Sequence, residues 1–223
     1  MKRDQTISEL RQDIVSGDWV VIATGRAKRP NDFLKGRRPR EFQPKSACPF
    51  EKVIPNRILV FSKRQSKNND WWLQVIPNKY PALTHYDACA SALSRGPYHL
   101  MGGVGHHDLV VTRDHYKNFA DLSLAKAATL FEVFKKRYRV LSADPCILYA
   151  SVFFNWGVTA GASLYHPHYQ ILSLPIIPPD VQHSISGTDR YFRKYGRCPH
   201  CEIISYERKE KKRIVADNGR AIA

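Results

Sequence analysis

One strong helical repeat between short strand patterns is the feature that most restricts the fold. In residues 121–141, apolar side chains recur at helical spacing, and Asp121 or Ser123 can cap the start of this helix. Strand patterns surround it, namely two in residues 9–24 and one each in 57–62, 71–76, 106–112, 147–154 and 165–174. Because strands outnumber helices and follow one another, we expect an α+β fold, a mostly antiparallel sheet with a long packed helix.

The pattern weakens after Pro178 and Pro179. Residues 1–178 hold all of these strand patterns and form one domain. The following stretch reads as a polar helix or an irregular segment, and "RIVADNGRAIA" at the end reads as a strand, a turn and the start of another strand. Strands need partners, so we expect residues 179–223 to be a linker and the incomplete start of a further unit.

Positive charge is in excess along the chain. Thirty-five Lys and Arg residues stand against 20 Asp and Glu, which gives a formal net charge of +15. This excess suits a phosphate-rich partner, either a nucleotide or a nucleic acid. Part of it lies in "ERKEKKR" (207–213), a run that also fits an ordinary solvated face.

The cellular context follows from what the sequence contains. No run of 18 apolar residues occurs, and "MKRDQTISEL" lacks the apolar stretch of a signal peptide. We therefore expect a cytoplasmic protein without a membrane partner. The five cysteines are odd in number and too sparse for a disulfide framework, so we expect reduced thiols or metal ligands.

The segment "YHPHYQI" places His166, His168 and Gln170 at alternate positions, so in a strand they share one face. A neutral imidazole is a good nucleophile toward phosphorus when its other nitrogen donates to a fixed acceptor. Here the nearest fixed acceptors would be backbone carbonyls of the same segment. Gln170 can hold a phosphoryl oxygen but cannot act as an acid. From spacing alone, an exposed polar strand face explains the pattern equally well.

Four stretches carry a family resemblance: "FFNWGVTAGASLYHPHYQI", "ELRQDIVSGDWVVIATGRAKRP", "PNKYPAL" and "RDHYKNFADLS". In their order along the chain, they resemble galactose-1-phosphate uridylyltransferases and related nucleotidyltransferases of the histidine-triad superfamily, over about residues 9–175. Members are similar to two tandem histidine-triad repeats and usually pair as dimers. The resemblance therefore implies a complete first repeat in 1–178, a truncated second repeat, and a homodimer.

The resemblance also implies roles for individual residues. His168 would be the nucleophile that takes a nucleoside monophosphate, most simply UMP, from a nucleotide sugar and passes it to a hexose 1-phosphate. Gln170 would bind the phosphoryl oxygens of the covalent intermediate. The nucleotide and its phosphates would contact Asn78, Phe153, Asn155, Gly161 and Ser163. The sugar phosphate would meet Arg26, Lys28 and Arg29, whose charge suits phosphate oxygens.

Two zinc sites are implied as well, both structural. Family members pair a Cys-x-x-Cys with two histidines, whereas this chain has Glu51 at the second cysteine position. Carboxylate oxygen is an acceptable zinc ligand, so the first set would be Cys48, Glu51, His115 and His166; the alternative is that the metal has been lost and hydrogen bonds hold these residues. Cys198 and Cys201 form a second pair, and their further ligands would fall beyond Ala223.

Several alternatives stay open at this point. The same histidine would serve a phosphorylase of an ADP-sugar or of a dinucleoside polyphosphate. A half-length relative that has lost catalysis is another option. Outside this class, "CPHC" and "ERKEKKR" could belong to a basic nucleic-acid-binding module, although no zinc-finger spacing follows Cys201.

Overall fold

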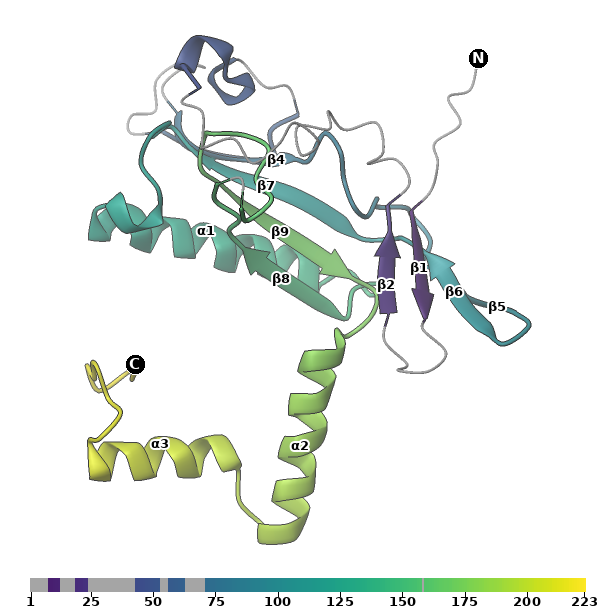
Figure 1. The fold of residues 1–223 in the computed structure, drawn as a ribbon, viewed down its shortest axis with the longest axis vertical. Coiled ribbons are helices and arrows are strands. Elements are labelled where there is room, and N and C mark those ends of the chain that lie inside the picture. Colours follow the sequence, from purple (N-terminus) through teal and green to yellow (C-terminus); the bar gives the residue numbers. More distant parts are fainter. Residues whose placement is uncertain (1–7, 13–18, 24–42, 53–55, 63–70, 158) are drawn as a thin grey trace. The chain divides into compact units, whose positions relative to one another are not determined.

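A computed structural model describes residues 8–12, 19–23, 43–52, 56–62, 71–157 and 159–223 (Figure 1). The chain forms two compact units, Met1–Ile176 and Ile177–Ala223. Among the described residues, no helix has the length and apolar character needed to cross a bilayer.

The first unit is built on a five-stranded antiparallel sheet with the order β3-β4-β7-β9-β8. Its strands are β3 (Leu59–Ser62), β4 (Trp71–Pro77), β7 (His106–Thr112), β8 (Tyr149–Phe153) and β9 (His168–Leu174). The expected strands are thus present. β9 begins at His168 rather than at 165, because Pro167 has no N–H to donate to a sheet ladder.

Helix α1 (Leu124–Ser142) is the predicted long helix, and it covers one face of this sheet (Figure 1). Ser123 is its N-cap, with the side chain accepting from the Lys126 N–H. The core between helix and sheet is largely apolar and consists of Leu73, Val75, Val110, Tyr169 and Ile171 from the strands with Leu130, Val133 and Leu141 from the helix. Across this core, Arg137 Nε donates to Asp108 Oδ2 at 2.6 Å, and both side chains are buried.

A second antiparallel sheet has the order β2-β1-β6-β5. Its strands are β1 (Glu9–Gln12), β2 (Trp19–Ile22), β5 (Ala92–Arg95) and β6 (Tyr98–Gly102). The pair β1 and β2 was predicted. The β5–β6 hairpin was not, because every residue of β5 is exposed and the strand shows no apolar face.

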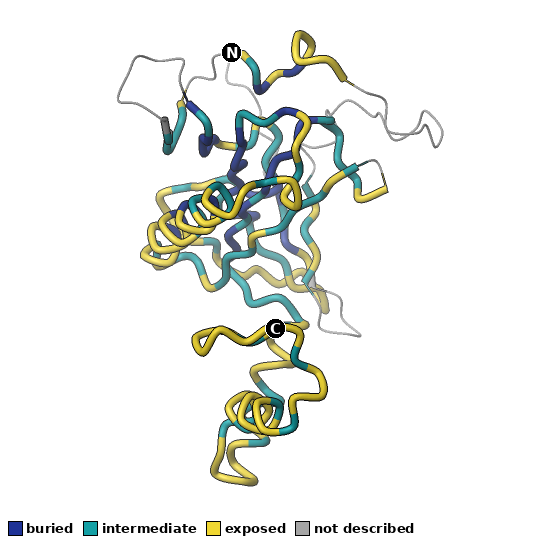
Figure 2. Tube along the Cα trace, turned by 90° about the vertical axis from the view of Figure 1, so that its left-hand side faces the viewer, coloured by how far each residue is buried: buried dark blue, intermediate teal, exposed yellow. Residues whose placement is uncertain are grey.

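The second unit contains helices α2 (Pro179–Tyr195), whose N-cap is Pro178, and α3 (Pro199–Glu210). Neither helix has a buried residue, in contrast to the buried centre of the sheet (Figure 2). The prediction of two strands in residues 213–223 is wrong. The chain there makes a turn closed by a single bridge between Asp217 and Ile222, with Gly219 at φ +82°.

The expectation that all cysteines are unpaired thiols or metal ligands is also wrong. Cys89 and Cys146, 57 residues apart, form a disulfide with their Cα atoms 5.0 Å apart. Cys48, Cys198 and Cys201 remain free. Which cysteines can pair depends on their distance in the fold, and the count of cysteines carries no such information.

Candidate active site

A cavity of about 520 Å³ lies against the sheet. Leu109 of β7 and His168 of β9 line it, whereas their strand neighbours Val110 and Tyr169 belong to the core beneath α1. Since successive strand residues point to opposite faces, the cavity lies on the face away from α1. Seven residues with predicted roles at a nucleotide site line it together: Asn78, Phe153, Asn155, Gly161, Ser163, His168 and Gln170. Arg26, Lys28 and Arg29 lie outside the described residues.

His168 is held in one protonation form by the backbone. Its Nδ1 lies 2.9 Å from the carbonyl oxygen of His166. A carbonyl only accepts, so Nδ1 must donate, and the neutral ring therefore carries its lone pair on Nε2. The side chain is 7% exposed and lines the cavity, and the Phe50 ring packs on it at 5.4 Å. This is the arrangement that the sequence predicted, in which a carbonyl of the same segment orients the imidazole.

Gln170 is oriented by a residue that the sequence analysis missed, His107. The Ala82 N–H donates to His107 Nδ1 at 2.9 Å, so this nitrogen has no proton. The neutral ring then has its proton on Nε2, which lies 2.9 Å from Gln170 Oε1 and donates to it. The amide oxygen of Gln170 is thereby committed to His107, and the group that Gln170 can offer to a ligand is its NH2.

Asn78 also lies beside His107, and its amide is oriented by a separate backbone hydrogen bond. Its Oδ1 accepts from the Tyr80 N–H at 3.0 Å, which fixes the amide so that Nδ2 faces His107 Nε2 at 3.1 Å. Both nitrogens carry protons in this arrangement, so no hydrogen bond forms between them. The alternation of "HHDLVV" could have placed His107 on the cavity face with Leu109, but the ring's tautomer depends on Ala82, a residue 25 positions away.

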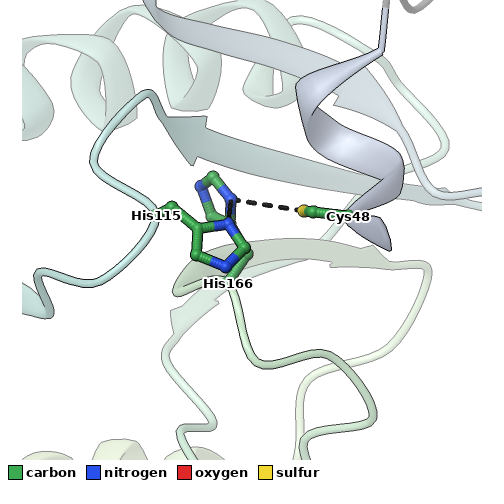
Figure 3. Close-up of side chains that lie close together, drawn as sticks. All are labelled: Cys48, His115 and His166. Atoms are coloured by element: carbon green, nitrogen blue, oxygen red, sulfur yellow. Dashed lines mark hydrogen bonds between the residues drawn. The ribbon is translucent and has the colours of Figure 1, made fainter. Parts of the chain in front are cut away.

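Three of the four residues predicted for the first zinc site, Cys48, His115 and His166, each place one ligand atom within 4.8 Å of the other two (Figure 3). His166 Nδ1 lies 3.1 Å from His115 Nδ1 and 3.5 Å from Cys48 Sγ. Glu51 Oε1 lies 3.6 Å from His115 Nδ1 and 3.8 Å from His166 Nδ1. Ligands about 2.0–2.3 Å from a tetrahedral zinc ion are separated by about 3.3–3.7 Å, so these four distances are close to those of a zinc site. Glu51 stands outside the group of ligand atoms that lie within 4.8 Å of one another, so its carboxylate would have to shift to complete the tetrahedron.

The positions of the ring protons in this cluster also favour binding of a cation. His115 Nε2 faces the Gln43 carbonyl at 2.8 Å, and His166 Nε2 faces the Thr112 carbonyl at 2.7 Å. Both outer nitrogens therefore donate, as metal-binding histidines usually do. The two inner Nδ1 atoms then face each other with lone pairs. Glu51 Oε1 is buried with no hydrogen-bond partner among the described residues, and a metal ion would satisfy all three atoms.

Burial sets the ionisation of the cluster. It lowers the pKa of His166 to about 4, which keeps this imidazole neutral near pH 7 and able to act as a ligand. Burial raises the pKa of the Cys48 thiol, so the thiolate needs a nearby cation. Phe50, between Cys48 and Glu51, packs on both His166 and His168 at 5.4 Å. The cluster therefore supports the wall of the cavity.

The second cysteine pair has a different environment. Cys198 is the N-cap of α3, and a hydrogen bond from the backbone N–H of Cys201 holds the pKa of the Cys198 thiol below its usual value. Within the part of the chain that the structure describes, no third ligand joins Cys198 and Cys201. The basic run after them is partly neutralised within the second unit, by ion pairs of Arg208 with Asp217 and of Arg213 with Glu207.

Comparison with known proteins identifies the family. Residues 1–178 match the sequence profile described as "Galactose-1-phosphate uridyl transferase, N-terminal domain". The chain belongs to the galactose-1-phosphate uridylyltransferase family. Its predicted membership and its α+β fold are thereby confirmed, with the chain corresponding to the N-terminal part of the family architecture.

Individual family members are similar over most of this chain. An ADP-glucose phosphorylase of Arabidopsis thaliana is 35% identical over 205 residues, covering 88% of this chain and 57% of its own length. A galactose-1-phosphate uridylyltransferase of Thermotoga maritima is 29% identical over 206 residues, covering 92% and 58%.

Solved structures of the family agree in fold. A uridylyltransferase structure matches with a TM-score of 0.67 at 26% identity, covering 94% of this chain and 59% of that one. The structure of an Arabidopsis thaliana ADP-glucose phosphorylase with bound ADP-glucose matches with a TM-score of 0.58 at 30% identity, covering 89% and 58%. The chain thus spans less than two thirds of the length of each of these family members.

Proposed function

We propose that this chain carries the nucleophile and the nucleotide site of an enzyme that transfers a nucleoside monophosphate through a covalent nucleotidyl-His168. The observation that supports this most directly is the hydrogen bond from His168 Nδ1 to the His166 carbonyl. It leaves the lone pair of the ring on Nε2, in a cavity large enough for a nucleotide. Family membership supports the same chemistry.

The first half-reaction follows from this geometry. His168 Nε2 attacks the α-phosphorus of a nucleotide sugar, a P–N bond forms, and the P–O bond to the β-phosphate breaks. The electron pair of that bond leaves with the sugar 1-phosphate. The substituted ring is cationic while Nδ1 keeps its proton, and the His166 carbonyl stabilises this charge. In the second half-reaction a phosphate oxygen of the acceptor attacks phosphorus, and the P–N bond breaks.

Gln170 acts on the phosphoryl oxygens in this scheme. Its NH2 group donates to the charge that develops in the transition state, and His107 positions that group by holding the amide oxygen. Asn155 and Ser163 line the same cavity and would contact the phosphates. Gly161, at φ +75°, has the left-handed backbone that glycine tolerates in such a turn.

The donor and the acceptor are the finer part of the proposal. UMP transfer to a hexose 1-phosphate follows from the family's name. Adenylyl transfer to free phosphate is supported by the higher identity to an ADP-glucose phosphorylase, 35% against 29% over nearly equal spans. We therefore expect ADP-glucose to be at least as good a donor as UDP-glucose.

We further propose a structural zinc ion held by Cys48, Glu51, His115 and His166. Zinc would neutralise the thiolate and the carboxylate and would fix the 3-10 helix Pro49–Glu51, which carries Phe50. The homodimer and the cytoplasmic location stay predictions. A nucleic-acid-binding module has less support, since "ERKEKKR" is engaged in ion pairs within its own unit.

Covalent labelling tests the proposal. The full chain is incubated with ADP-glucose or UDP-glucose carrying ³²P at the α-position, denatured at alkaline pH and separated from free nucleotide. We expect acid-labile label on the wild type and none on His168→Asn, with His183→Asn on the exposed face of α2 as the matched control. A wild-type chain that acquires no label from either donor would contradict the covalent mechanism for these donors.

A further inference from the structure

A second group of metal-binding side chains lies outside the candidate active site. His85, His106 and Asp144 come from three separate segments, and one ligand atom of each lies within 4.8 Å of the other two. His106 begins β7, Asp144 follows the C-cap of α1, and His85 follows the bridge between Thr84 and Val104. We propose that these three side chains bind a divalent transition-metal ion, independently of the nucleotide chemistry proposed above.

The distances are those of a site that needs little adjustment. Asp144 Oδ2 lies 3.2 Å from His106 Nε2 and 3.6 Å from His85 Nδ1. Ligands about 2.0–2.1 Å from a tetrahedral ion are about 3.3 Å apart. The rings of His85 and His106 stack with centroids 4.5 Å apart and an interplanar angle of 18°, so their nitrogens face the carboxylate from the same side.

Contacts with the backbone hold two of the ligands in place. Asp144 Oδ1 accepts from the Cys146 N–H at 2.9 Å, which directs Oδ2 toward the histidines. The His106 N–H donates to Ser173 Oγ at 2.9 Å and fixes the start of β7 on β9. The side chain of Asp144 and that of His106 are largely buried, at 17% and 20% exposed.

The Cys89–Cys146 disulfide joins the segment that carries His85 to the segment that carries Asp144. Cys89 lies four residues after His85, and Cys146 lies two residues after Asp144. The bond therefore keeps the His85 segment beside the turn that follows α1. In addition, the Thr84 N–H donates to the Gly103 carbonyl at 3.1 Å, next to His85 in the chain. Restraint of this kind around the ligands is what distinguishes a metal site from a chance meeting of side chains.

The ligand set selects the kind of ion. Two imidazoles and one carboxylate suit Zn²⁺, Co²⁺, Ni²⁺ or Cu²⁺, whereas Ca²⁺ and Mg²⁺ prefer oxygen ligands. The His85 side chain is half exposed, so solvent reaches this side and a water molecule can complete the coordination. The site has no thiolate, unlike the clusters at Cys48 and at Cys198, and this difference makes it separately measurable.

Cobalt spectroscopy of the full chain tests the proposal. Cobalt bound to thiolate gives a near-ultraviolet charge-transfer band, whereas cobalt bound to imidazole and carboxylate gives only weaker visible bands. We expect His106→Gln and His85→Gln each to lose one equivalent of bound Co²⁺ and its visible absorption while keeping the charge-transfer band. His183→Gln is the matched control. Because His85 is half exposed, its variant should fold even if His106→Gln does not.

Unchanged cobalt stoichiometry in His85→Gln, with unchanged visible absorption, would overturn the proposal and leave the three side chains as a hydrogen-bonded cluster. Zinc competition with a chromophoric chelator tests the role of the disulfide. Replacing Cys89 and Cys146 together by Ser should weaken zinc binding at this site by about tenfold, the low end of the effect of losing an outer-shell restraint. Equal affinity would overturn that role.

Discussion

The orientation of Gln170 by His107 leads to a quantitative prediction. His107→Asn is the informative change, because the Asn side-chain oxygen can replace Nδ1 as the acceptor for the Ala82 N–H but cannot reach Gln170. The substitution therefore removes one hydrogen bond and leaves the backbone contact in place. A neutral hydrogen bond contributes about 1 kcal/mol, which corresponds to about fivefold in the rate of nucleotidyl transfer to His168.

A double-mutant cycle separates this effect from a general loss of structure. Gln170→Ala alone should slow labelling about a hundredfold, as expected for the loss of a donor to a developing anion. In the Gln170→Ala background, His107→Asn should change the rate less than twofold, because there is no amide left to orient. The rate constants come from rapid-quench labelling with α-³²P nucleotide sugar. A fivefold loss in both backgrounds would refute the reasoning.

The tautomer of His107 can be measured without any activity. Its ¹⁵N imidazole shifts should report protonated Nε2 and unprotonated Nδ1, since the Ala82 N–H donates to Nδ1. This measurement keeps the structural argument testable whatever the donor specificity turns out to be. Protonated Nδ1 would contradict the assignment of the Gln170 amide.

Three further predictions concern stability and metal binding. In metal-free protein, the pKa of His166 is about 4 in the folded state, below its ordinary value of 6.5, so the unfolded chain binds more protons between these two pH values. The free energy of unfolding should therefore fall by up to about 3 kcal/mol as the pH drops from 6.5 to 4. Urea unfolding at each pH measures this fall, and His166→Gln should remove it. Arg137→Met leaves the buried Asp108 carboxylate without its partner and should lower the free energy of unfolding by about 3–5 kcal/mol. Adding Asp108→Leu to this variant should recover much of the lost stability. An undiminished loss in the double variant would argue against the ion pair as its cause. Glu51→Cys should tighten zinc binding by adding a second thiolate, whereas Glu51→Ala should weaken it; equal chelator-competition curves for the three proteins would show that residue 51 is not a ligand.

The sequence predicted those parts of the fold that carry their own periodicity. The repeat in α1 reflects burial on one face, and β7 and β9 are runs rich in apolar residues that are buried along most of their length, so these three elements were located to within a few residues. The hairpin of β5 and β6 was missed because all of β5 is exposed. The Cys89–Cys146 disulfide was missed because nothing local relates two residues 57 positions apart.

In the candidate site too, the sequence predicted what depends on local spacing and missed what depends on tertiary contacts. The pairing of His168 with a carbonyl of its own segment follows from local spacing, and the sequence predicted it. The orientation of Gln170 depends on His107 and on the Ala82 N–H, which are distant in the chain. Tautomers of this kind are decided by tertiary contacts, so residue types alone could not supply them.

His166 makes contacts in both proposed sites through two different parts of the residue. Its ring nitrogen faces Cys48 and His115, and its carbonyl oxygen holds the Nδ1 proton of His168. An ion at the proposed zinc site would bind this ring, and the peptide group of the same residue orients the His168 imidazole. Under the proposed mechanism, exchanging zinc for a larger ion such as cadmium should therefore change the rate of labelling of His168 without touching the substrate. A descendant chain that lost these ligands would have to restrain the same peptide unit by other means before its nucleophile could work at the original rate.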